Sequence, residues 1–288
     1  MKNSMPTAAM SLIACAALIA ACAKKNEPAA PVAEPAVEAA AEPATSEPAT
    51  PEALAPAADY AAVAAAAIAD PARPEEDRKD DERRKPAVAL EFFQLAPGMT
   101  VFEIEAGAGW YTELLSRVVG PSGAVVMQNP EGFLKFVGEQ ITARLAGDRL
   151  ANVRQSISNF DALDAADASI DVATWVQGPH ELYLKSSTGE GLGDPAKSYA
   201  EIYRILKPGG AFAVIDHSAL AGAPETTGND LHRVDRAIVV SLAEAAGFRL
   251  EAESDFLANP DDARTIAVFD PSIRGYTDQF ALRFRKPN

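Results

Sequence analysis

The residues best suited to bind a ligand lie in a glycine-rich turn, "EAGAG", at positions 105–109. Val101, Phe102 and Ile104 precede the turn in a pattern typical of a buried strand, and a helical pattern follows it. A strand that passes through such a turn into a helix is typical of nucleotide-binding sites. Glu105 stands where these turns usually begin with glycine. Three interpretations therefore stay open: a working cofactor site, an altered site, or a structural turn.

Three histidines are the candidates for acid–base chemistry. His180 follows a predicted strand, His217 ends the next strand, and His232 opens the helix after it. Histidine titrates near neutral pH, so each could act as a general base or as a structural hydrogen-bonding group. We expect His180 to be the first choice for a catalytic base, with His217 and His232 behind it. No HxH or HxxxH spacing supports a metal site, and none is predicted.

The order of the other segments predicts an α/β fold. Strand-like segments occur at 100–104, 124–128, 153–157, 170–176, 211–215, 250–256 and 279–285, and most are separated by helical patterns. This alternation indicates a parallel sheet covered by helices. The loops that would leave the carboxyl ends of three strands are long, at 177–193, 217–230 and 257–278. Because ligands bind at that edge of a parallel sheet, we expect a pocket there.

The segments "VFEIEAGAGWYTELL" and "EIYRILKPGGAFAVIDH", in this order, resemble the class I S-adenosylmethionine-dependent methyltransferases. The resemblance covers about residues 86–285. A closer likeness is to a poorly characterised group of predicted bacterial methyltransferases, many of them exported, through "GPHEL", "LHRVD" and "DPSIRGYTDQFALRFRKP". It implies a Rossmann-like, mostly parallel seven-stranded sheet with an antiparallel last strand and helices on both faces. It also implies S-adenosylmethionine as the cofactor and methyl transfer to an unknown, small-molecule acceptor.

The resemblance also assigns roles to individual residues. Glu103 matches the acidic residue that orients the methionine end of the cofactor, and Gly107 and Gly109 match the second and third glycines of the turn. Asn129 matches the acidic residue that holds the ribose. Phe160 and Asp161 match the pair that frames the adenine.

Two further residues of the turn region have open roles. Tyr111 could contact the methionine end or the acceptor, or only pack the helix. Glu105 departs from the family pattern, as Asn129 does, and its carboxylate could meet the cationic end of the cofactor. The two departures leave a second function class open, a noncatalytic ligand-binding or scaffolding protein of the cell envelope.

The N-terminus predicts an address in the cell envelope. Lys2, an apolar run to Ala21 and "LIAAC" resemble a bacterial lipoprotein signal at residues 1–21, with Cys22 as the lipidated residue. The alternative is an ordinary secretory signal. Ala23 favours the outer membrane, on the periplasmic side. The only other cysteine is Cys15, inside the signal, so the mature chain has no thiol for a disulfide.

Composition divides the rest of the chain. Residues 22–57 are rich in Ala, Pro and Glu and predict a disordered tether, residues 58–85 a helical lead-in, and residues 86–288 the methyltransferase-like domain. The charged run "RPEEDRKDDERRKP" is interpreted as a solvated helix face. A formal net charge of −15 argues against a nucleic-acid partner. The sequence does not determine the oligomeric state.

Overall fold

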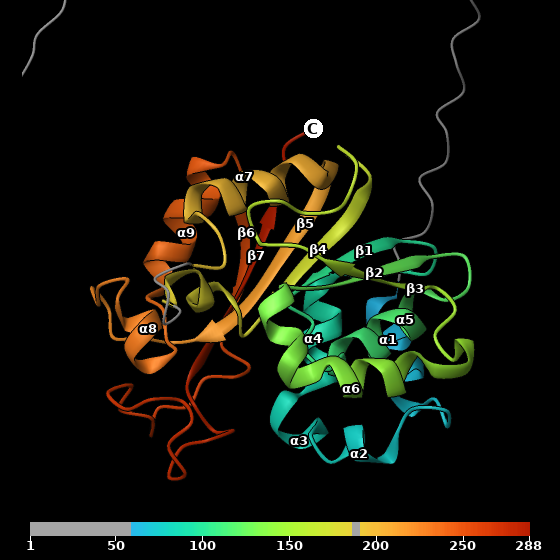
Figure 1. Ribbon diagram of the computed structural model, residues 1–288, viewed down its shortest axis with the longest axis horizontal. Helices are drawn as coiled ribbons and strands as arrows, with labels where there is room; N and C mark the ends of the chain where they lie inside the picture. The colour runs from blue at the N-terminus through green and yellow to red at the C-terminus, as the bar shows by residue number, and fades with distance from the viewer. Residues whose placement is uncertain (1–58, 186–190) are drawn as a thin grey trace, which may run out of the picture. The chain divides into compact units, whose positions relative to one another are not determined.

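A seven-stranded mixed sheet organises the structure, a computed structural model that describes residues 59–185 and 191–288. The strand order is β3-β2-β1-β4-β5-β7-β6, and only β7 runs antiparallel to its neighbours. The strands are β1 Thr100–Ile104, β2 Ala124–Asn129, β3 Val153–Ile157, β4 Ile170–Val176, β5 Leu206–His217, β6 Arg249–Ser254 and β7 Gln279–Arg285. The predicted α/β fold with an antiparallel last strand is confirmed (Figure 1).

Helices cover both faces of the sheet. They are α1 Tyr60–Ala69, α2 Glu75–Arg78, α3 Asp81–Arg84, α4 Pro86–Phe93, α5 Trp110–Val119, α6 Leu134–Leu145, α7 Pro195–Ile205, α8 Thr227–Leu231 and α9 Arg236–Ala245. Within the described residues, no helix is both long enough and apolar enough to cross a membrane.

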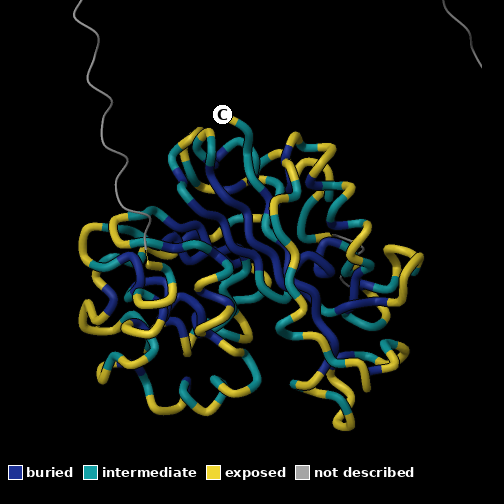
Figure 2. Tube along the Cα trace, turned by 180° about the vertical axis from the view of Figure 1, so that it is seen from behind, coloured by how far each residue is buried: buried dark blue, intermediate teal, exposed yellow. Residues whose placement is uncertain are grey.

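The alternation of side chains along the strands creates two separate cores. Phe102 of β1 and Trp175 of β4 point to the face covered by α7 and α9, where they join Tyr199. Val101, next to Phe102 in β1, and its register partner Val172 in β4 point to the face covered by α1, α4 and α5. The buried residues consequently run as a continuous band along the strands (Figure 2).

The helix predicted at 231–246 is interrupted in the structure. His232 adopts a left-handed conformation and ends α8, and α9 begins at Arg236 after Asp235, whose side chain accepts a hydrogen bond from the Ala237 N–H. An aspartate at this position stabilises a new helix start. The break matters for the site because it places His232 in a turn rather than within a helix.

The "LKPGG" segment, predicted as the turn before the fifth strand, forms the irregular beginning of β5. Leu206 is fully buried and pairs with Ile170 of β4, and the register shifts between Ile170 and Val172. Gly209 has a φ of 73°, a conformation that favours glycine. The strand can thus begin five residues earlier than its hydrophobic pattern indicates.

Candidate functional site

The glycine-rich turn leaves the carboxyl end of β1 in three left-handed steps. Glu105, Gly107 and Gly109 have φ values of 54°, 57° and 85°. A Cβ on Gly109 would lie 2.7 Å from Cδ of Arg144 and 2.9 Å from Cε of Met127, whereas a Cβ on Gly107 would meet nothing within 4 Å. Gly109 therefore permits close packing at the start of α5, and Gly107 leaves an open side at which a ligand can approach the backbone.

The last two residues of β2 hold the turn in place. The Glu105 N–H donates to Oε1 of Gln128, and the Ala106 N–H donates to the Gln128 carbonyl. The Gly107 N–H donates to Oδ1 of Asn129 at 2.9 Å, and Nδ2 of Asn129 donates to the Gly107 carbonyl at 3.1 Å. Both side chains are fully buried. Asn129 thus braces the turn with both ends of its amide, an arrangement that does not support the predicted contact with a ribose.

Glu105 turns its carboxyl toward β4. Its Oε2 accepts a hydrogen bond from Nε1 of Trp175 at 3.0 Å. A Cβ on Gly178 would lie 2.3 Å from this oxygen, so the approach depends on glycine at 178. Burial raises the pKa of Glu105 well above its usual range, and the nearby negative charge of Glu181 adds to the effect. Both effects favour the neutral form of the carboxyl, which weakens the predicted attraction to a cationic cofactor.

Glu103, just before the turn, and Tyr111, just after it, are both buried. The Thr112 hydroxyl donates a hydrogen bond to Glu103, and burial raises the pKa of this carboxyl to about 8. Tyr111 packs against Phe93 and Trp110, and burial raises its pKa to about 12. Tyr111 also lines a cavity of about 10 Å³ at the end of β4, which has room for about one water molecule.

Phe160 and Asp161 lie against the chain segment that enters α7. The Phe160 N–H donates to the Leu192 carbonyl, and Oδ2 of Asp161 accepts from the Asp194 N–H at 3.1 Å. The Phe160 ring packs on Trp175 with 4.8 Å between ring centroids. Phe160 therefore contacts the same indole that holds Glu105, which connects the predicted adenine position to the glycine turn.

The structure brings the three histidines together, as their predicted positions indicate. The His180 ring lies in η3, Pro179–Tyr183, with its centroid 5.8 Å from that of His217 and 5.5 Å from that of His232. Nδ1 of His180 is 2.7 Å from Oδ1 of Asp216, and the His180 N–H donates to the other oxygen of that carboxylate. The side chains of His180 and Asp216 are almost completely buried.

The charges of this cluster change the prediction for the base. Burial alone would lower the pKa of His180, but the charge and hydrogen bond of Asp216, together with Glu181, raise it to about 10. Burial lowers the pKa of His217 to about 3. At neutral pH His180 already carries the proton that a base would accept, and His217 is a weak base. The geometry does not support either as the predicted general base.

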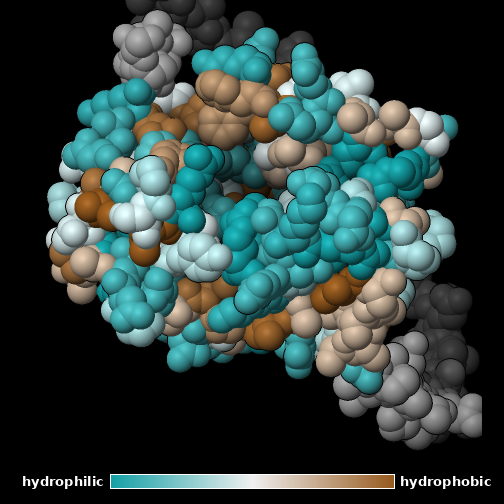
Figure 3. Space-filling model, turned by 90° about the horizontal axis from the view of Figure 1, so that it is seen from below, coloured by the Kyte–Doolittle hydropathy of each residue, from teal (hydrophilic) through white to brown (hydrophobic). Residues whose placement is uncertain are grey.

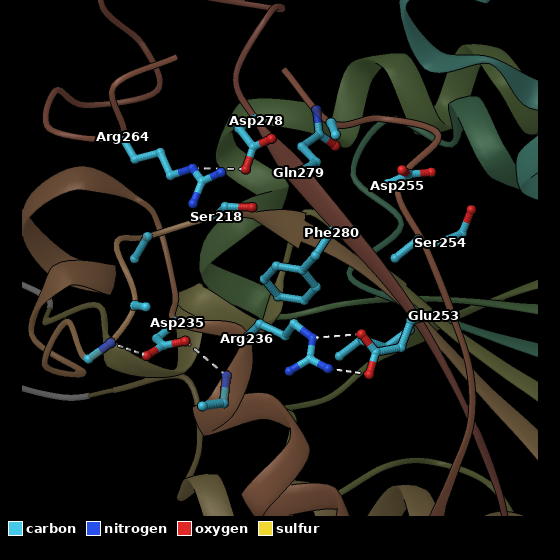
Figure 4. A pocket seen from close by; sticks show the side chains of 17 residues that line it. Ser218, Asp235, Arg236, Glu253, Ser254, Asp255, Arg264, Asp278, Gln279 and Phe280 are labelled. Carbon is cyan, nitrogen blue, oxygen red and sulfur yellow. Dashed lines mark hydrogen bonds and ion pairs between the residues drawn. The ribbon is translucent and has the colours of Figure 1, made fainter. Parts of the chain in front are cut away.

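A large cavity lies elsewhere, beside β6 and β7. It measures about 750 Å³ and is lined partly by the long loops after β5 and β6, including Ser218 and Arg264. Figure 4 shows two ion pairs among its charged side chains, Arg236 with Glu253 and Arg264 with Asp278, whereas Asp255 is drawn without a partner. The long loops do form a cavity, and both of its arginines are already paired with carboxylates of the protein.

The charged N-terminal run is solvated on one side, as the sequence interpretation expects, where Glu75, Glu76, Lys79 and Glu82 are exposed, but its other side is buried. Arg73 is only 2% exposed and Asp77 8%. Asp77 forms two hydrogen bonds with Arg144 of α6, and its carbonyl accepts from Nε1 of Trp110. Nε of Arg144 in turn donates to the Ala108 carbonyl at 2.7 Å. The buried side of the run packs against the start of α5 and the glycine turn, and its charges there are paired rather than hydrated.

Several residues of the site carry no clear signal in the sequence. Gln128, Trp175 and Asp216 lie inside strands, where polar and aromatic residues are equally common as structural elements. Glu181 directly follows His180 in "GPHEL", and Asp216 directly precedes His217 in "IDH". For Glu181 and Asp216, the neighbouring histidine in the sequence is the one feature that could have identified them.

Seen from below, the surface around the carboxyl ends of the strands is mostly hydrophilic (Figure 3).

Comparison with known proteins agrees with this fold and turn. The ubiE/COQ5 methyltransferase family matches residues 85–226. A ubiquinone/menaquinone biosynthesis C-methyltransferase of Hydrogenovibrio crunogenus is 31% identical over 196 residues, which are 68% of this chain and 66% of that protein. The corresponding protein of Legionella pneumophila is 32% identical over 130 residues, 45% of this chain and 47% of that protein. The chain spans between about half and two thirds of the length of these relatives.

Solved structures share the fold. A methyltransferase from Aquifex aeolicus superposes with a TM-score of 0.51 at 23% identity, covering 74% of this chain and 98% of the other. A geranyl diphosphate C-methyltransferase from Streptomyces coelicolor superposes with a TM-score of 0.52 at 14% identity, covering 77% and 89%. The strand order, the turn after β1 and the family match together define the class: the chain belongs to the class I S-adenosylmethionine-dependent methyltransferase superfamily. Within it, the sequence match is to the ubiE/COQ5 family.

The turn can be tested against S-adenosylmethionine, the cofactor of this superfamily. Gly107 offers an open backbone surface next to the N-terminus of α5, which fits a ligand lying across the turn. Asn129 fits less well, because both ends of its amide are engaged by Gly107. The residues present can hold the cofactor through the backbone of the turn, without a free acidic side chain at the end of β2.

Proposed function

We propose that this chain is an S-adenosylmethionine-dependent methyltransferase that acts on a small-molecule acceptor. The observation that carries the proposal is the left-handed turn with its open side at Gly107, directly after β1 of the fold. The match of the ubiE/COQ5 family over residues 85–226 supports it. The relatives named above are C-methyltransferases of quinone biosynthesis, but the chain spans too little of their length to assign that acceptor here.

The residues of the chain would contribute positioning rather than covalent chemistry. The cofactor supplies an electrophilic methyl group, and its transfer needs an in-line approach in a site from which water is excluded. The cofactor would lie against the open side of the turn at Gly107, and Trp175 and Phe160 form an apolar wall beside the turn. His180, held as a cation by Asp216, acts on the acceptor side as a fixed hydrogen-bond donor and not as a base.

Titration of S-adenosylhomocysteine into the purified full chain tests the cofactor assignment. We expect saturable binding that is lost in Gly107→Val, because the new side chain would occupy the open side of the turn. Gly147→Val is the matched control, since Gly147 has a similar φ of 66° and its Cβ would also meet nothing within 4 Å. Wild-type affinity in Gly107→Val, or no binding by the wild-type chain, would contradict the proposal.

We also propose that the protein is anchored to the cell envelope through Cys22. The support is the "LIAAC" segment, which lies outside the described residues together with the predicted tether. Radiolabelled palmitate should be incorporated into the wild-type chain and not into Cys22→Ala. If neither chain incorporates the label, the proposed lipid anchor is refuted, but the cofactor assignment is unaffected.

A second candidate is a noncatalytic ligand-binding protein of the envelope. The engagement of Asn129 by Gly107 favours it, because the site then lacks the free β2 carboxylate that the family resemblance implies. The two candidates differ in one readout. A methyltransferase converts S-adenosylmethionine to S-adenosylhomocysteine in the presence of its acceptor, whereas a binding protein leaves the ligand unchanged.

A further inference from the structure

Three metal-binding atoms converge beside the glycine turn, outside the residues proposed to hold the cofactor. They are Nε2 of His180, a carboxylate oxygen of Glu181 and Nδ1 of His232, and all lie within 4.8 Å of one another. They come from two segments that pack together, η3 and the end of α8. Two imidazole nitrogens and one carboxylate oxygen form a ligand set that suits zinc.

The distances between these atoms agree with a tetrahedral site. Oε1 of Glu181 lies 3.3 Å from Nε2 of His180 and 3.5 Å from Nδ1 of His232. Ligands at about 2.0 to 2.2 Å from a tetrahedral zinc ion are separated by about 3.3 to 3.6 Å. The third pair, between the two histidines, is the widest at up to 4.8 Å. A small rotation of the His232 ring, whose side chain is 23% exposed, would close it.

Asp216 has the position of a residue that supports a metal ligand. Its carboxylate bonds Nδ1 of His180, which directs Nε2 toward Glu181. Histidines that ligate metals usually make such a bond with their other nitrogen, because it fixes the ring orientation and the tautomer. The His180 N–H also donates to Asp216, so the ligand is held at both backbone and side chain.

Two atoms of the cluster lack a hydrogen-bond partner within residues 59–185 and 191–288. They are Nδ1 of His232 and Oε2 of Glu181, and both are buried. Buried polar atoms are almost always paired, so each such atom needs an explanation. A metal ion bound at this cluster would satisfy Nδ1 of His232 directly, and a water molecule in the fourth position of the ion could donate a hydrogen bond to Oε2 of Glu181.

We propose that His180, Glu181 and His232 bind one divalent transition-metal ion, with zinc as the preferred ion. Three protein ligands leave a fourth position open, the pattern of zinc sites that bind water or a substrate atom. The site goes beyond the proposed methyl transfer and does not depend on it; the ion replaces the proton on Nε2 of His180, so in the metal-bound protein His180 is a ligand and not a hydrogen-bond donor. If both are present, the open position is suited to a thiol or hydroxyl of the acceptor, because zinc lowers the pKa of such groups.

Metal titration of the full, tag-free chain tests the proposal. After removal of metals with a chelator, Zn²⁺ is added in competition with a chromogenic chelator, and Co²⁺ absorption reports the coordination geometry. We expect one equivalent per chain and tetrahedral Co²⁺ bands. His232→Ala and Glu181→Gln should each weaken Zn²⁺ binding at least 100-fold. Asp216→Asn should weaken it 10- to 100-fold, the effect usual for a supporting residue.

Two controls separate this site from nonspecific binding by an acidic chain. Asp230→Asn removes an exposed carboxylate of α8, and His217→Gln removes the neighbouring histidine, whose Nδ1 is bonded to Thr277. Both should bind Zn²⁺ like the wild type. No saturable binding, or equal affinity in wild type, His232→Ala and Glu181→Gln, would overturn the proposal. Titration of S-adenosylhomocysteine into the same samples keeps this outcome separate from the cofactor assignment.

Discussion

Replacing the buried Glu103 with glutamine should change how stability depends on pH. Burial raises the pKa of this carboxyl to about 8 in the folded state, from an ordinary value of 4.5. Between these two values the folded state binds more protons at this group than the unfolded chain does. The free energy of unfolding contributed by Glu103 therefore falls as pH rises through this window. Glutamine has no proton to lose and can still accept the hydrogen bond of Thr112.

The magnitude follows from the two pKa values. At about 1.4 kcal/mol per pH unit, the difference between 4.5 and about 8 corresponds to at most about 5 kcal/mol. Glu103→Gln should thus gain stability relative to the wild type as pH increases from 5 to 8. Other titrating groups are common to both proteins and cancel in the comparison. Urea unfolding followed by circular dichroism at pH 5, 6, 7, 8 and 9 gives the difference directly.

Glu113, in α5, provides a contrast of opposite sign. Burial would raise the pKa of Glu113, but hydrogen bonds and charges from Arg149 and Arg117 outweigh burial and lower it. Its contribution to stability is present above the ordinary pKa of 4.5 and is lost as pH falls through the lowered value. Glu113→Gln should therefore destabilise the protein at neutral pH, and less at acidic pH.

A difference in unfolding free energy between Glu103→Gln and the wild type that stays constant from pH 5 to 9 would refute the raised pKa of Glu103.

Three further predictions concern the glycine turn. Gly109→Ala should destabilise the protein by about 2–5 kcal/mol, because alanine is strained in the left-handed conformation and its Cβ would collide with Arg144. The control Gly147→Ala, which has the strain without the collision, should destabilise it by about 1–2 kcal/mol. Equal urea midpoints for the two variants would contradict the packing role of Gly109. Asp77→Asn should weaken S-adenosylhomocysteine binding, because Arg144 then holds the Ala108 carbonyl less firmly; calorimetry giving wild-type affinity would show that the N-terminal run does not position the turn. Glu105→Gln should bind S-adenosylhomocysteine as tightly as the wild type, since the carboxyl it replaces is neutral; a tenfold loss in the same assay would restore a role for its charge.

Much of the architecture can be predicted from the sequence because it depends on local periodicity. The bounds of β1, β3, β4 and β7 agree with the segments predicted from hydrophobic patterns. Helix α1 lies within the helical lead-in predicted at residues 58–85, and the edge on which the histidines meet follows from parallel strand order alone. These features need only the alternation of apolar residues and the connectivity of a parallel sheet.

The chemical state of the site depends on contacts between distant segments, which no local pattern reports. His180 is held as a cation because Asp216, 36 residues away, meets its ring in a buried environment. The pKa of Glu105 is raised because the fold buries its carboxyl and places it near Glu181. Asn129, which the family resemblance assigns to the ribose of the cofactor, is hydrogen-bonded to Gly107 of the turn.

The sequence by itself determined the fold class, the glycine turn and the gathering of the histidines, since these follow from residue order along single elements. Only the tertiary structure decided which side chains are charged and which are already bonded. Burial and nearby charges set a pKa, and both arise when segments far apart in sequence pack together. For the same reason, the ligand set of His180, Glu181 and His232 became visible only once η3 and α8 were placed side by side.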